Sequence, residues 1–298
     1  GGGTALAGLY VDALGFGAAS TVDVGDLSIA VQAGGITQQD AFHVAGNASF
    51  DAGAGNVFLT HADNDFAGPV ALRGDSVQVR DRSALTLGAL DVGELAANST
   101  GALGLGSGSI AGVLVARSGG GAISQAGALS VGGVSTIDAG AGAITLDNAG
   151  NDFASLVRLE GGAAVVRDAN ALHLDTLDVA GLTATSGGAL SLGSGSVAGN
   201  LVATSQGGGI TQAGALSVAG TSSIDAGAGN ITLTNAGNDF ASLVGLSGGA
   251  IALRDRNDLT LSHLRSAPGG DVHVVAGGAL ALPAQAIDAG SGSLHLAA

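Results

Sequence analysis

Apolar and small polar residues alternate in short runs along most of this chain. Residues 215–218 read Ala-Leu-Ser-Val, 231–233 read Ile-Thr-Leu, and 250–253 read Ala-Ile-Ala-Leu. Runs of this kind, bounded by Gly, Asn, Asp and Ser, predict short strands with one buried face. Glycine recurs every few residues, and each glycine inside a helix costs about 1 kcal/mol relative to alanine. The pattern therefore predicts an all-β protein.

The pattern itself repeats every 87 residues. Residues 121–157 and 208–244 differ at only seven of 37 positions, and a weaker copy occupies residues 34–70. Self-similarity at a fixed period is typical of repeat architectures. The copies follow one another without an insertion, as they would if each copy stacked on the equivalent parts of its neighbours.

The connections between the predicted strands favour a coil over hairpins. No Asn-Gly or Asp-Gly pair lies at hairpin spacing, and the frequent breaks are Gly-Gly, Ala-Gly and Ser-Gly. We therefore expect a parallel β-helix, or solenoid, of about 13 to 14 rungs, in which each 87-residue copy supplies about four rungs that average about 22 residues. The chain would form one solenoid.

Its expected parts are irregular first rungs at 1–33, where Tyr10 and Phe16 have no counterpart, and copies at 34–120, 121–207 and 208–298. A small insertion near 265–273 interrupts the third copy.

Composition and charge narrow the possible partners. Cysteine is absent, so no disulfide holds the fold. The chain contains nine Arg and 24 acidic residues, which gives a formal net charge of −15. That charge repels phosphate backbones and anionic lipids, so we expect no nucleic-acid partner. No apolar run approaches the roughly 18 residues that a spanning helix needs, and no signal peptide is evident. We expect no membrane insertion, and a piece of a longer secreted chain.

An Asn-Asp-Phe triplet occurs once in each copy. The three triplets are Asn64, Asp65 and Phe66; Asn151, Asp152 and Phe153; and Asn238, Asp239 and Phe240. We interpret them as corners, in which Asn adopts a left-handed conformation, Asp caps backbone N–H groups and Phe enters the rung. A row of calcium sites is the alternative, because Asp and Asn oxygens are hard ligands.

Two further acidic series recur with the same period. The first is an Arg-Asp pair at Arg80 and Asp81, Arg167 and Asp168, and Arg254 and Asp255. We interpret each pair as a solvated ion pair at a corner, which contributes little to stability; part of a polysaccharide-cleaving site is the alternative. The second series, Asp51, Asp138 and Asp225 of the sequence DAGAG, is assigned to turns.

No residue pattern predicts catalysis or a cofactor. The six histidines, His43, His61, His173, His263, His273 and His295, show no shared register and no ligand spacing, so we expect no metal site. No serine lies in a strand-to-helix elbow, and no helix start or lysine follows the Gly-rich stretches.

Two stretches of the third copy carry a resemblance to a known family. GGGITQAGALSVAGTSSIDAGAG and NITLTNAGNDFASLV resemble the central repeats of filamentous haemagglutinin-like exoproteins, which are large adhesins of Gram-negative bacteria exported by two-partner secretion. The resemblance covers roughly residues 25–296. It implies a right-handed parallel β-helix, export through an outer-membrane transporter, and a place at the bacterial cell surface. It carries no functional residues over to this chain.

The sequence therefore predicts a structural shaft segment, a rigid spacer in a secreted adhesin that is not itself an enzyme. One alternative is a module that binds host or neighbouring-cell glycans or proteins on a β-helix face, with its site at an irregular rung near Tyr10 or 265–273. The other alternative is a β-helical polysaccharide lyase or hydrolase.

Overall fold

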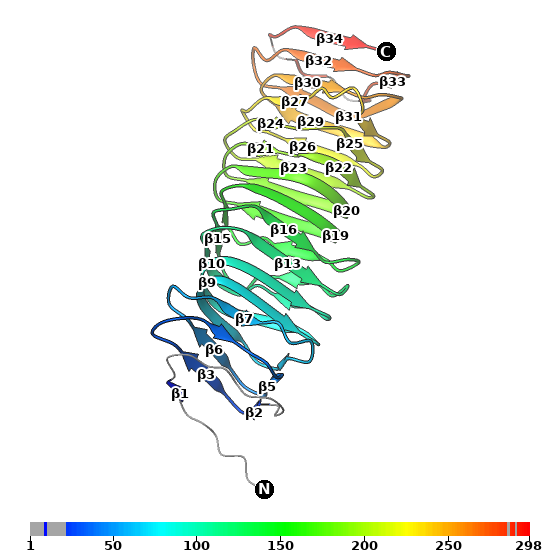
Figure 1. Ribbon diagram of the computed structural model, residues 1–298. Helices are drawn as coiled ribbons and strands as arrows, with labels where there is room; N and C mark the ends of the chain where they lie inside the picture. Colours follow the sequence, from blue (N-terminus) through cyan, green and yellow to red (C-terminus); the bar gives the residue numbers. More distant parts are fainter. Residues whose placement is uncertain (1–8, 11–21, 285–286, 290) are drawn as a thin grey trace. The chain divides into compact units, whose positions relative to one another are not determined.

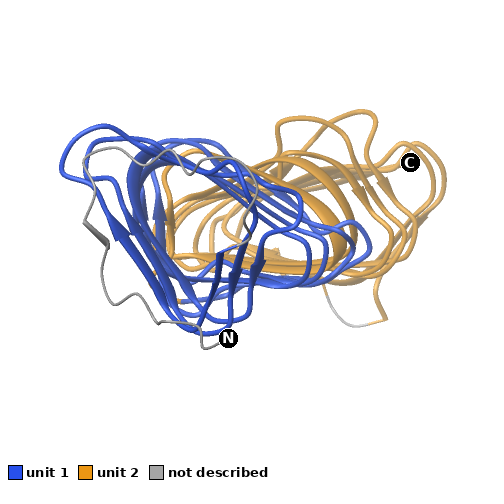
Figure 2. Ribbon diagram, turned by 60° about the horizontal axis from the view of Figure 1, so that its bottom comes forward, with its two compact units in different colours: residues 1–148 blue, residues 149–298 orange. Residues whose placement is uncertain are grey.

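The protein is built from parallel strands in two compact units. The computed structural model describes residues 9–10, 22–284, 287–289 and 291–298, and it divides the chain into unit 1, residues 1–148, and unit 2, residues 149–298 (Figure 2). No helix occurs among the described residues, and none of them forms a segment able to cross a membrane as a helix. The prediction of an all-β protein is confirmed.

Unit 1 consists mostly of short strands. They are β1 (Leu9–Tyr10), β2 (Val22–Val24), β3 (Leu27–Ala30), β4 (Ile36–Thr37), β5 (Phe42–Val44), β6 (Ala48–Asp51), β7 (Val57–Leu59), β8 (Asp65–Phe66), β9 (Val70–Asp81), β10 (Leu85–Ser99), β11 (Leu103–Gly104), β12 (Ser107–Ile110), β13 (Leu114–Ser118), β14 (Ile123–Ser124), β15 (Leu129–Val131), β16 (Ser135–Asp138) and β17 (Ile144–Leu146).

Unit 2 follows the same scheme. Its strands are β18 (Asp152–Phe153), β19 (Leu156–Asp168), β20 (Leu172–Ser186), β21 (Leu190–Ser191), β22 (Ser194–Val197), β23 (Leu201–Ser205), β24 (Ile210–Thr211), β25 (Leu216–Val218), β26 (Ser222–Asp225), β27 (Ile231–Leu233), β28 (Asp239–Phe240), β29 (Leu243–Gly248), β30 (Ile251–Arg254), β31 (Leu259–Ser266), β32 (Val272–Val275), β33 (Leu280–Ala281) and β34 (Leu294–Ala297).

Most strands pair in parallel with the strand one turn later, so that the turns lie in layers (Figure 1). One ladder of unit 1 joins five buried residues on successive turns, Ile36, Val57, Val77, Leu95 and Leu114. Aliphatic residues thus stack on aliphatic residues along the interior. The predicted parallel β-solenoid is confirmed, with about 14 turns in the two units together; its right-handed winding stays a prediction.

The 87-residue repeat does not match a whole number of turns. Four turns lead from Ile36 only as far as Leu114, which falls short of a full period. The counterpart of Ile36 in the next copy is Ile123, which lies on the next side of the coil, in a separate ladder with Leu85 and Leu103. Each turn of the coil has three sides. One 87-residue copy therefore spans four turns and one further side. The expectation that each copy stacks on the equivalent parts of its neighbour is wrong.

Two long strands cause this mismatch. β9 pairs with β6 through Val70–Arg73 and with β7 through Val77–Val79, so it runs through a corner that elsewhere takes a loop. β10 continues the same path on the next turn. A turn that contains a continuous strand has no loop at that corner. It therefore contains fewer residues than the average rung expected from the sequence. Equivalent residues of successive copies consequently lie on successive sides of the coil.

The DAGAG sequences form turns, as predicted. In unit 2, Asp225 Oδ1 accepts a hydrogen bond of 2.8 Å from the N–H of Gly227, whose φ of 57° favours glycine. A Cβ at Gly229 would press against the carbonyl oxygen of Gly208 on the preceding turn, so this corner admits only glycine. Asp51 and Asp138 form the same turn in unit 1, with distances of 2.8 and 3.1 Å.

The insertion in the third copy divides one long strand. β20 runs without interruption in the second copy, whereas its counterpart is split into β31 and β32 by a turn through Pro268 and Gly269, whose φ is 82°. At the other end of the chain, Tyr10 pairs with Ala30 through the backbone of β1. Phe16, and with it most of the segment expected to be irregular, lies outside the described residues.

Candidate functional site

The two predicted polar series meet in one corner of the coil. The backbone N–H of Arg82 bonds to the carbonyl oxygen of Asn64, so the turn that contains Asp81 lies directly on the turn that contains the triplet. Asn64 and Asp81 are fully buried, and Phe66 is buried against them. Phe153 and Phe240 are buried in the same way, as expected. Buried polar groups of this kind need hydrogen-bond partners.

The buried asparagine joins two turns through its side-chain amide. Asn64 Oδ1 accepts bonds from the N–H of Phe42 at 2.9 Å and from Gln38 Nε2 at 2.7 Å, both on the preceding turn. Asn64 Nδ2 donates to Gln38 Oε1 at 2.8 Å and to the carbonyl oxygen of Leu59 at 3.1 Å. Four hydrogen bonds therefore use both ends of the amide.

Unit 2 repeats this arrangement. Asn238 Oδ1 accepts from the N–H of Leu216 at 3.0 Å and from Gln212 Nε2 at 2.7 Å, and Asn238 Nδ2 donates to Gln212 Oε1 at 2.8 Å. Further bonds reach the carbonyl oxygens of Leu233 at 3.1 Å and Arg254 at 3.2 Å. Buried Asn151 holds the equivalent place in the sequence of the second copy.

The buried aspartate attaches the next turn. Asp81 Oδ2 accepts from the N–H of Phe66 at 2.7 Å, and Asp81 Oδ1 accepts from the N–H of Ser83 at 2.6 Å. Asp168 accepts the same two bonds, from the N–H of Phe153 at 2.6 Å and from the N–H of Asn170 at 2.6 Å. Asp255 accepts them from the N–H of Phe240 at 2.6 Å and from the N–H of Asn257 at 2.9 Å. We call the glutamine, the asparagine and this aspartate the polar clip: Gln38, Asn64 and Asp81 in unit 1, and Gln212, Asn238 and Asp255 in unit 2.

The interpretation of the Arg-Asp neighbours as solvated ion pairs is wrong. Successive side chains of a strand point to opposite faces, so Asp81 at the end of β9 faces the interior while Arg80 faces solvent. Arg167 and Arg254 likewise lie outside while Asp168 and Asp255 are buried. Burial raises the pKa of Asp168 above its ordinary value, although the N–H groups of Phe153 and Asn170 oppose this shift.

The aspartate of the triplet has a different role from the one expected. Asp65 Oδ2 accepts a bond of 2.6 Å from Arg82 Nη2, and Asp65 Oδ1 accepts from Ser83 Oγ at 3.3 Å. Asp239 forms the same pair with Arg256 at 2.5 Å, whereas Ala169 stands at this position beside Asp152. The hydrogen bond from Arg82 lowers the pKa of Asp65. The backbone cap at this corner thus comes from Asp81, on the following turn.

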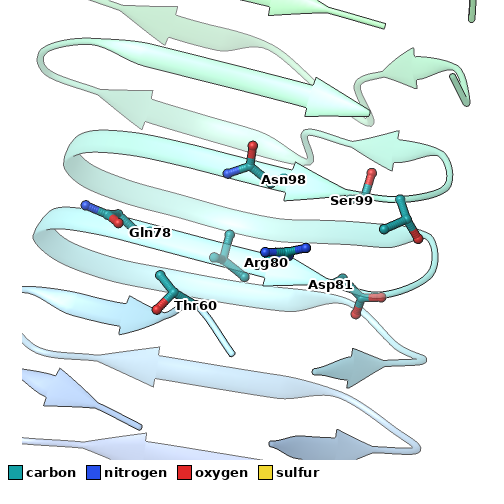
Figure 3. A pocket seen from close by; sticks show the side chains of 8 residues that line it. Thr60, Gln78, Arg80, Asp81, Asn98 and Ser99 are labelled. Atoms are coloured by element: carbon teal, nitrogen blue, oxygen red, sulfur yellow. The ribbon is translucent and has the colours of Figure 1, made fainter. Parts of the chain in front are cut away.

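A shallow polar groove lies on the outer face of unit 1 beside the clip (Figure 3). It has a volume of about 410 Å³ and is lined by Thr60, Gln78, Val79, Arg80, Asp81, Asn98, Ser99 and Thr100. In Figure 3 the Arg80 side chain lies between Thr60 of the turn below and Asn98 of the turn above. No other described side chain forms an ion pair or hydrogen bond with its guanidinium. The groove therefore offers hydrogen-bond donors and one positive charge.

The chemistry of these sites is limited by how the polar groups are used. Within the described ranges, no group of three or more His, Cys, Asp and Glu side chains could hold a metal ion. The clip carboxylates accept two backbone N–H groups each and are buried. Sequence reasoning missed Gln38 and Gln212, although the pattern Ile-Thr-Gln followed 26 residues later by the triplet asparagine marks both.

The fold and the recurring clip define the protein as a parallel β-solenoid built from sequence repeats. A family model described as "Repeats of unknown function (DUF5649)" matches residues 3–73, 92–160 and 181–247, which make up more than half of the chain. The chain belongs to this family. The three matches end at residues 73, 160 and 247, so the family model follows the 87-residue period. No curated protein and no solved structure compared with the chain matches it.

Proposed function

We propose that the chain is a structural spacer in a large secreted adhesin of bacterial surfaces, and that it is not an enzyme. In this proposal the solenoid separates other parts of the parent protein from the cell. The repeat family and the β-solenoid fold agree with a structural module. Receptor binding and any effector activity would belong to other parts of the parent chain.

One observation carries this proposal: the asparagine and the aspartate of the polar clip, which the copies share, are used inside the coil. Asn64 and Asp81 are fully buried, and together they bond backbone groups of three successive turns. Buried carboxylates that accept two N–H groups are poor candidates for acid–base catalysis, because the substrate cannot reach them. This shared clip therefore serves the connection between turns.

The phase of the repeat supports the same conclusion. An outward residue that recurs every 87 positions moves by one side of the coil in each copy, as Ile36 and Ile123 do for inward positions. Asp51 accordingly stacks with Arg73, whereas Asp138 stacks with Arg117 in another ladder. Repeated outward residues do not form a single flat recognition face, which weighs against a repeated binding surface.

The secreted location rests on composition and on the resemblance to filamentous haemagglutinin-like exoproteins. A chain without cysteine can pass through an outer-membrane transporter unfolded and fold afterwards without oxidation. Folding along a stack of turns needs only contacts with the preceding turn. We therefore infer a transporter as the export partner, and host or neighbouring-cell surface molecules as partners of the parent protein.

Stretching single molecules tests the spacer function. The chain is held by its two ends in optical tweezers and pulled. We expect each unit to resist extension and then to unfold in discrete steps. Asn238→Ala, which removes the asparagine amide of the polar clip of unit 2, should lower the unfolding force of that unit only. Unit 1 and Thr232→Ala, an exposed change on the same turns, serve as controls. Gradual extension of the wild-type chain at low force would refute the proposal.

A second candidate function is recognition of an acidic sugar in the groove of unit 1. The observation that favours it is the exposed Arg80, which has no ion-pair partner among the described side chains and lies between Gln78 and Asn98. Against it, no aromatic ring lines this groove for a sugar to stack on. Titration with acidic oligosaccharides decides the matter: binding that Arg80→Ala abolishes, while Arg167→Ala leaves it intact, would establish the candidate.

A further inference from the structure

Two histidines occupy adjacent positions of one outward column in unit 2. His273 of β32 pairs with His295 of β34, and Ala252 of β30 lies below them. Both imidazoles are exposed, and their ring centroids lie 4.7 Å apart with an interplanar angle of 68°. The expectation that the histidines share no register is therefore wrong, because the interval between these two matches one turn at this point of the coil.

This column departs from the repeat. The equivalent outward positions in the first copy hold Gln78, Ala96 and Val115, and those in the second copy hold Val165, Thr183 and Val202. Only the third copy has imidazoles in this column; His273 lies directly after the insertion that splits β31 from β32, and His295 lies one turn later. The inward neighbours remain aliphatic, since Val272 stacks on Ile251. Packing of the coil thus gives no reason for the two histidines.

The separation of the rings fits a shared ligand. With a metal–nitrogen bond of about 2.0 Å and a ring radius of about 1.2 Å, two imidazoles in cis positions on one ion have centroids about 4.5 Å apart. The observed 4.7 Å lies close to this value. Asp271, two residues before His273, already accepts the N–H of Ser293 through Oδ1 at 2.8 Å. Water would fill the remaining coordination positions.

We propose that His273 and His295 form a surface site for one divalent transition-metal ion, and that Cu²⁺ binds most tightly. Imidazole nitrogen suits Cu²⁺, Ni²⁺ and Zn²⁺, and affinity for a given nitrogen site rises to Cu²⁺ and falls again at Zn²⁺. A tetragonal ion accepts two cis nitrogens and water oxygens without further protein ligands. The net charge of −15 adds a general attraction for cations.

Titration of the full chain with Cu²⁺ tests the proposal, with calorimetry for affinity and electron paramagnetic resonance for nitrogen ligands. We expect one tight site with two imidazole nitrogens. The second imidazole acts at a high effective concentration, so His273→Ala and His295→Ala should each weaken binding by about 10-fold or more. His173→Ala is the matched control, because this exposed histidine of β20 stacks between Leu156 and Ser191. Cu²⁺ that binds to the N-terminal amine or to carboxylates does so equally in all variants, so this binding does not affect the comparison.

Equal affinity in the wild type and in both variants would overturn the proposal, and so would an equal loss in His173→Ala. Circular dichroism verifies that the variants fold, as expected for exposed positions. A second readout needs no variant: substoichiometric Cu²⁺ should broaden the NMR signals of His273 and His295 before those of the other four histidines. Uniform broadening of all six would contradict the site. Zn²⁺ should bind at the same pair but more weakly.

Discussion

Removing the amide of Asn238 should destabilise unit 2 strongly. Asn238→Ala deprives the buried N–H of Leu216 of its partner, and it removes one donor each from the carbonyl oxygens of Leu233 and Arg254. A buried group left without a partner costs about 1–3 kcal/mol. Gln212 is only half-buried, so its amide can turn to water. We expect a loss of about 3 kcal/mol in the free energy of unfolding, since one buried N–H is orphaned and two carbonyl oxygens each lose a hydrogen bond.

The loss can be measured separately for the two units. The chain has no tryptophan, so far-ultraviolet circular dichroism follows unfolding, and a loss of about 3 kcal/mol should lower the melting temperature of a unit of this size by roughly 6–12 °C. Hydrogen exchange of peptides around Leu216 locates the change in unit 2. Thr232→Ala, on exposed Thr232 of β27, should stay within about 0.5 kcal/mol.

A loss below about 1 kcal/mol for Asn238→Ala would show that water satisfies this corner and that the clip does not hold the turns together. Faster exchange that spreads equally into unit 1 would contradict the local role of the clip as well.

Four further predictions follow from the geometry. Ser222→Ala should raise the free energy of unfolding by about 1 kcal/mol, because the buried Oγ has no hydrogen-bond partner among the described residues and the first copy has Ala48 at this position; a destabilised variant in urea titration would show that the hydroxyl is bonded. Phe153→Ala should cost about 3–5 kcal/mol by the same measurement, since the ring is buried, and a loss within noise would place it outside the core. Asp65→Asn should lose stability at neutral pH, and the difference should vanish as the pH falls through the folded-state pKa, which the bond from Arg82 holds below the unfolded value; a constant difference in acid would refute the ion pair. EDTA should leave the melting temperature unchanged, because the described part of the chain holds no group of three possible metal ligands, and a drop of several degrees would reveal a structural ion.

The sequence predicted the strands and their stacking into a coil because the information is local. Alternation identifies inward residues such as Val57 and Leu95 without any knowledge of their partners. The phase of the repeat was missed because it depends on the length of each turn, and turns that contain a continuous strand are shorter than turns that contain a loop. Nothing in residues 70–81 signals that β9 runs through a corner as one strand, with Gly74 in its middle.

The clip was missed for a related reason. Asn64 meets Gln38 across 26 residues, and Asp81 meets Phe66 across 15, so the pairing follows only from the register between turns. From the sequence, the Arg80 and Asp81 neighbours suggested an ion pair because oppositely charged residues were adjacent. Strand geometry places the two side chains on opposite faces, and the buried one is the aspartate.

These findings also indicate where a ligand site in such a chain should be sought. The shared residues that join successive turns, such as Asn238 and Phe240, are buried. Outward positions carry no such constraint, because changing them alters neither the ladders nor the clip. The column that holds Thr183 in the second copy holds His273 in the third, while its inward neighbours stay aliphatic. Residues that differ between copies and share an outward column are therefore better candidates for function than the residues that repeat.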